Sequence, residues 1–165
     1  MGQLTVRALR VVLVALLAGS VFVQTVMVAL LAKDLEELDP EYAYLRVPLL
    51  AIIVLGILTI QVVLVCVWRL VTMVRRGTVF SHGAFRYVHV IIGAIVAAAA
   101  LTFALGWLLA PGEAVAPGLV LLIGGAGVGI LGVALVVVVL RMLLAQAVAR
   151  DVEAAQLKAE LEEVI

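Results

Sequence analysis

Four long runs of apolar residues constrain the fold of this chain more than any other feature. The runs are residues 11–32, 47–68, 88–110 and 119–140, and none of them contains Asp, Glu, Lys or Arg. An α-helix needs about 20 apolar residues to cross a hydrocarbon core roughly 30 Å thick. The sequence therefore predicts four transmembrane helices, packed as an all-α integral membrane four-helix bundle.

The composition agrees with this fold class and indicates a single membrane domain. Hydrophobic residues make up 67% of the 165-residue chain and charged residues 13%, whereas soluble domains are about 45 to 50% apolar and about 25% charged. We assign residues 1–144 to the four-helix domain. Residues 145–165 are rich in Ala, Leu, Glu and Gln, which favour helix, and are expected to form a cytoplasmic amphipathic extension.

The first apolar run resembles a signal peptide only in its flanking charges. Arg7 and Arg10 come immediately before it, as basic residues do in a cleavable signal peptide. The apolar region of a signal peptide is typically about 7 to 15 residues long, and this run is longer. We therefore expect it to be kept as the first transmembrane helix.

The distribution of basic residues predicts which side of the membrane each end occupies. With four spans, the N-terminus, the connector between the second and third spans, and the C-terminal extension share one side. That side holds Arg7, Arg10, Arg69, Arg75, Arg76, Arg86, Arg141, Arg150 and Lys158. Only Lys33 and Arg46 fall on the other. The positive-inside bias makes the first side cytoplasmic. The Arg-rich, Lys-poor composition is typical of a GC-rich bacterial genome, and we therefore expect the membrane to be a bacterial inner membrane.

A few polar residues and glycines interrupt the apolar runs. Gln24, Thr59 and Gln61 are expected to make contacts inside the membrane, either hydrogen bonds between helices or contacts to a substrate. Gly125 and Gly129 form a GxxxG pair, which permits close helix packing. We expect that packing to be within the chain, with a helix kink or an oligomer contact as the alternatives.

Residues with catalytic or metal-binding chemistry are scarce. His82 and His89 are seven positions apart with no nearby carboxylate or thiolate to complete a metal site, and Cys66 is the single cysteine. No metalloprotease, nucleophile-elbow or paired-cysteine motif is present in the sequence. The sequence therefore predicts no enzyme activity, no metal and no cofactor.

Two strings carry a family resemblance. RRGTVFSHGAFRYV at residues 75–88 and LRMLLAQAVARDVEAAQLKAELEEVI at residues 140–165 resemble an uncharacterised bacterial family of small four-span membrane proteins, domain of unknown function 2975. The resemblance implies a four-helix membrane fold and brings no catalytic residues. It also implies an association of some members with small helix-turn-helix regulators.

The polar residues that distinguish the chain gather on the predicted cytoplasmic face. We therefore expect a non-enzymatic docking, sensing or regulatory scaffold. Its docking surface would comprise Arg75, Arg76, Gly77, Phe80, His82, Arg86, Arg150, Asp151 and Glu153. The expected partners are membrane lipids, a cytoplasmic protein and, as an open alternative, a second copy of the chain, without direct nucleic-acid binding.

A small transporter or an oligomeric channel subunit is the alternative function. Gln24, Thr59, Gln61 and Thr102 would then line a polar path through the membrane. Proton relays and coupled transport sites usually contain an ionisable group at membrane depth, and the four apolar runs contain no Asp, Glu, Lys or Arg. The sequence favours the docking function for this reason.

Overall fold

A computed structural model describes residues 3–36, 40–75, 82–111 and 115–164 of the chain. Its regular elements over these ranges are helices. In chain order they are α1 (Gln3–Phe22), the π-helix η1 (Val23–Met27), α2 (Val28–Glu36), the 3₁₀ helix η2 (Pro40–Leu45), α3 (Arg46–Arg75), α4 (His82–Leu109) and α5 (Pro117–Val164). The predicted all-α class is confirmed.

Four of the helical segments are long and apolar enough to cross a membrane: Val6–Glu36, Tyr42–Met73, Phe85–Leu109 and Pro117–Glu162. Three of them contain a whole predicted apolar run, and Phe85–Leu109 contains the run 88–110 except for Ala110. The first segment is continuous because α1, η1 and α2 follow one another directly. Large apolar side chains are exposed along all four segments, as expected for surfaces that face lipid. The chain is a multi-pass membrane protein with a four-helix bundle fold.

Proline residues and one arginine define the ends of the helices. Pro117 is the first residue of α5, a position where its fixed backbone angle suits a helix start and its missing N–H is not needed. On the same side of the bundle, Arg46 Nη2 donates a hydrogen bond of 2.8 Å to the Glu36 backbone carbonyl at the end of α2. This bond satisfies a terminal carbonyl and ties the end of the first span to the start of the second.

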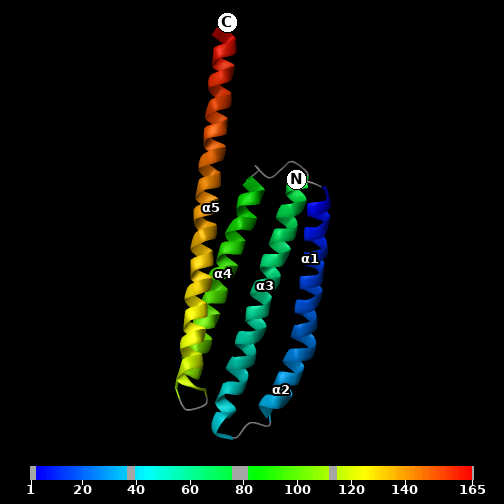
Figure 1. The fold of residues 1–165 in the computed structure, drawn as a ribbon, viewed down its shortest axis with the longest axis vertical. Coiled ribbons are helices and arrows are strands. Elements are labelled where there is room, and N and C mark those ends of the chain that lie inside the picture. Colours follow the sequence, from blue (N-terminus) through cyan, green and yellow to red (C-terminus); the bar gives the residue numbers. More distant parts are fainter. Residues whose placement is uncertain (1–2, 37–39, 76–81, 112–114, 165) are drawn as a thin grey trace.

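The four spans alternate in direction and pack mainly in the order α1, α3, α4, α5 (Figure 1). The contacts of α4 with α5 and with α3 are far more extensive than those between α1 and α3. Small residues occupy the closely packed part of the bundle, formed by α3, α4 and α5, where Ala94, Ala99 and Ala134 are buried. The first span is therefore the least closely packed of the four.

One end of the bundle collects the segments that the charge distribution places together. The start of α1, the end of α3, the start of α4 and the C-terminal part of α5 lie at the same end in Figure 1, at the top of the view. The α5 helix continues well past the ends of its neighbours there, as an uninterrupted helix of 48 residues. The membrane domain and the C-terminal extension thus share one helix.

Candidate functional site

A polar cluster links the first two spans in the middle of their apolar segments. Gln61 on α3 donates from Nε2 to Gln24 Oε1 at 2.9 Å and to Ser20 Oγ at 3.3 Å. The Ser20 hydroxyl in turn donates to the Leu17 backbone carbonyl at 2.9 Å. An amide that bridges two helices in this way stabilises their contact where the hydrophobic effect cannot act between them. The structure thus gives Gln24 and Gln61 contacts with each other.

The π-helix η1 (Val23–Met27) places Gln24 within this cluster. Single π turns add one residue to a helix and commonly occur at functional positions. The Thr25 hydroxyl lies within hydrogen-bond distance of two carbonyls of the preceding turn, Val21 at 2.9 Å and Phe22 at 3.2 Å. Backbone groups need such partners in lipid because no water is available to them. The unbroken apolar run 11–32 predicts a regular helix and gives no sign of this π turn.

The two threonines of the predicted polar path lie elsewhere. The Thr59 hydroxyl donates to the Gly56 carbonyl at 2.7 Å, and the Thr102 hydroxyl donates to the Ala98 carbonyl at 2.8 Å, each within its own helix. Both residues line a predominantly apolar groove of about 540 Å³ between α3 and α4. Gln61 faces the first span instead, toward Ser20 of α1 and Gln24 of η1. Among the described residues, these four side chains therefore do not converge on one polar path.

The glycine that packs between helices is not one of the predicted pair. A Cβ atom added to Gly125 or Gly129 would meet no atom of the described structure within 4 Å, whereas one added to Gly127 would lie 3.0 to 3.2 Å from the Phe103 ring. The expectation that Gly125 and Gly129 pack within the chain is therefore wrong. All three glycines lie on α5, and the helix presents Gly127, which is buried, to α4.

The predicted docking residues are only partly within the described structure. Arg76, Gly77 and Phe80 lie outside it, as do the side chains of Arg75, the last residue of α3, and His82, the first of α4. The remaining members are exposed at the same end of the bundle: Arg86, Arg150, Asp151 and Glu153. Over residues 149–162 of α5, every described side chain is exposed.

Groups that could perform chemistry remain dispersed. Cys66 is buried as a free thiol in α3. Among the residues that the structure describes, no group of three or more His, Cys, Asp or Glu side chains is placed to hold a metal ion. The described residues thus offer polar contacts and an exposed helix as their candidate sites.

An arginine site at the end of the α1–α3 contact is a feature that sequence reasoning missed. Arg10 on α1 stacks over the Trp68 ring of α3, with its Cζ atom 5.6 Å from the ring centroid. Its Nη2 donates to Thr72 Oγ1 at 3.3 Å. The sequence does contain a hint of this contact. Arg10 precedes the first apolar run and Trp68 ends the second, so both are expected at the same membrane surface, where both residue types are common.

Comparison with known sequences places this architecture in a family. Residues 30–165 match the family described as "Protein of unknown function (DUF2975)". The chain belongs to this family. The predicted resemblance is thereby confirmed. The DUF2975 match begins within α2 and includes η2, α3, α4 and α5, while α1 and η1 precede it. No curated protein and no solved structure matches the chain.

Proposed function

We propose that this chain is a non-enzymatic membrane protein that docks a cytoplasmic protein on the projecting part of α5. The observation that supports the proposal is that every side chain of residues 149–162 is exposed, including large apolar ones. The exposed fractions are 52% for Val152, 61% for Leu157 and 63% for Leu161. Apolar side chains on a helix that projects into water favour a partner that covers them.

The cytoplasmic location of this helix is part of the proposal. Eight of the eleven Lys and Arg residues of the chain belong to described segments at the end of the bundle from which α5 projects. Short loops with excess Lys and Arg remain on the cytoplasmic side of bacterial membranes. We therefore assign both termini to the cytoplasm and the bundle to a bacterial inner membrane.

The sequence of the extension indicates the chemistry of its partner. Leu157 and Leu161 are four residues apart and lie on one face of the helix. Residues 150–165 carry five acidic residues, Asp151, Glu153, Glu160, Glu162 and Glu163, against two basic residues, Arg150 and Lys158. The partner that fits is a protein with an apolar groove for a helix and basic residues along its rim.

The test uses a photo-crosslinking amino acid at Ala154 in the full-length protein in cells. We expect one discrete crosslinked protein, which disappears when Leu157 and Leu161 are both replaced by Glu. The matched control is Gln156→Glu, which adds one negative charge at an exposed neighbouring position and should leave the crosslink unchanged. Crosslinked products that are the same in the double variant and the control would overturn the proposal.

A further inference from the structure

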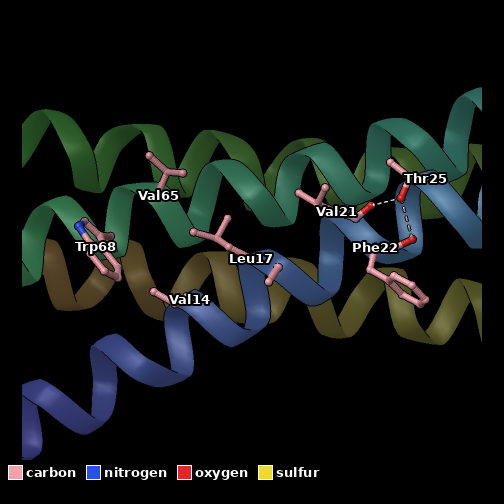
Figure 2. Close-up of a pocket in the computed structure, with 8 residues that line it drawn as sticks. Val14, Leu17, Val21, Phe22, Thr25, Val65 and Trp68 are labelled. Carbon is pink, nitrogen blue, oxygen red and sulfur yellow. Dashed lines mark hydrogen bonds between the residues drawn. The ribbon is translucent and has the colours of Figure 1, made fainter.

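The groove between α1 and α3 combines an apolar wall with a cationic end. Its volume is about 780 Å³, and it is lined by Val14, Leu17, Ala18, Val21, Phe22, Thr25, Val65 and Trp68. Figure 2 shows Trp68 at one end of it and Phe22 and Thr25 at the other. The volume is in the range of roughly 300 to 1,000 Å³ that is typical of ligand sites.

Arg10 lies at the Trp68 end of this groove. It is one helical turn before Val14, on the face of α1 that bears the groove residues, and its guanidinium stacks on the same Trp68 ring that lines the groove. The charged group is therefore next to the apolar wall. The first transmembrane run begins at the following residue, Val11, so Arg10 is at the depth of the lipid headgroups.

The hydrogen-bonding capacity of Arg10 is largely unused. A guanidinium has five N–H donors, and Arg10 makes one long hydrogen bond, 3.3 Å to Thr72. Its Nε atom is shielded from solvent and has no partner within the described structure. No carboxylate among the described residues pairs with it. A half-buried cation in this state is suited to an anionic acceptor, and a phosphate accepts two parallel N–H bonds from a guanidinium.

We propose that the groove binds one anionic phospholipid of the bilayer, with an acyl chain along the apolar wall and the phosphate at Arg10. A second copy of the chain fits less well, because a two-fold contact through this groove would bring two Arg10 side chains together. The acyl chain of a zwitterionic lipid could also pack against the apolar wall, but its choline or ethanolamine cation would be repelled by the positive charge of Arg10. The charge of the site therefore selects the headgroup.

The experiment follows the fluorescence of Trp68, which is one of two tryptophans in the chain. A Trp107→Phe background leaves Trp68 as the only one. The full-length protein is reconstituted in vesicles at about 0.15 M salt, where charges separated by more than roughly 8 Å are screened. Quenching is compared in two mixtures. In the first, phosphatidylglycerol brominated in the acyl chain is diluted in phosphatidylcholine; in the second, brominated phosphatidylcholine is diluted in phosphatidylglycerol. The test does not depend on which face is cytoplasmic.

We expect a preference for phosphatidylglycerol that falls about fivefold in Arg10→Gln, the factor for one basic residue near an anionic surface. Arg10→Lys keeps the charge and should keep most of the preference. Arg86→Gln removes an exposed charge at the same end of the bundle, but from α4, which does not line the groove, and should leave the preference nearly unchanged. For each variant, the Trp68 fluorescence in each brominated mixture is divided by its fluorescence in the same mixture without bromine.

A second variant tests the apolar wall without touching the charge. Ala18→Phe would fill the groove, and it should lower the quenching of Trp68 by both brominated lipids. Equal quenching by the two lipids in the parent protein would overturn the proposal, as would an unchanged preference in Arg10→Gln with native helix content. Weak quenching by either lipid from a protein that elutes as a dimer would assign the groove to a second copy and also overturn it.

Discussion

The two halves of this bundle are held together by different physical means. The α4–α5 contact is close, with Ala99 and Ala134 almost fully buried and Gly127 against the Phe103 ring. The contact between the first span and α3 is looser, and it uses the Gln24–Gln61 bridge from η1 and the stacking of Arg10 of α1 on Trp68. Membrane helices associate either by close approach of small residues or by interhelical hydrogen bonds. This chain uses one means in each half.

The difference has a consequence for where ligands and partners can bind. Close packing of small side chains leaves no room between α4 and α5 for a guest at Gly127. A contact made by a few long polar side chains holds two helices at separate points and leaves a groove between those points. The apolar groove between α3 and α4 has no charged residue in its lining, so the candidate site for an anionic lipid is the groove beside Arg10, while the projecting end of α5 is available to a protein.

The largest expected effect is in the closely packed half. Gly127→Leu places a branched side chain where even a Cβ atom would be 3.0 Å from the Phe103 ring, and overpacking of this kind typically costs about 1 to 3 kcal/mol. We expect the free energy of unfolding in detergent micelles to fall by that amount. Gly129→Leu, on a face with open space, is the control and should be neutral or slightly stabilising, since Leu favours helix over Gly. Equal losses in both variants would show that the α4–α5 packing is not what distinguishes this half.

A smaller effect is expected for the amide bridge. A double-mutant cycle of Gln24→Leu and Gln61→Leu isolates the energy of the pair, and such interhelical bonds in membranes average about 0.6 kcal/mol with a maximum near 1.7 kcal/mol. We expect a coupling energy in that range from unfolding measurements. The pair of Gln24→Leu with Thr59→Val serves as the control, because Thr59 bonds within its own helix, and should show no coupling. A Gln24–Gln61 coupling indistinguishable from this control would contradict the role assigned to the bridge.

The smallest effect concerns the π turn beside the bridge. Thr25→Val removes the hydroxyl that reaches the Val21 and Phe22 carbonyls. Because Thr25 is exposed, we expect a loss at the low end of the range for intramolecular hydrogen bonds, about 0.5 kcal/mol. We expect faster amide hydrogen exchange over η1 and the turn before it. Thr102→Val removes a similar bond from the regular helix α4, where the effect on local exchange should be less. Equal changes at both sites would mean that Thr25 has no special part in stabilising the π turn.

Several features of the fold were predictable because each depends on one property of the chain. The four spans follow from the length of the apolar runs, and their boundaries from nearby prolines such as Pro117 and charges such as Arg46. The polar residues Gln24 and Gln61 were recognisable as residues that need partners in lipid. Their mutual contact was not predictable, because it depends on which helices are neighbours and on their rotation.

The glycines of α5 illustrate the limit of prediction most directly. Gly125, Gly127 and Gly129 are equivalent in sequence terms, and the spacing of the first and third favoured them as the packing pair. In the structure α5 presents Gly127 to Phe103, and the other two have open space around them. The rotation of α5 about its axis is determined by its whole contact with α4, which no local motif contains. The contact of Arg10 with Trp68 was likewise not predictable from a local motif, because the two residues are 58 positions apart in the chain.

The sequence alone determined that this protein is a helical membrane protein with four spans and a polar, helix-forming C-terminus, because hydrophobic length and residue propensity act locally along the chain. The tertiary structure decided which small residue is buried, which amides bond and where a groove opens beside an arginine. These features depend on the rotation and spacing of neighbouring helices, and many weak contacts along each pair of helices set both together.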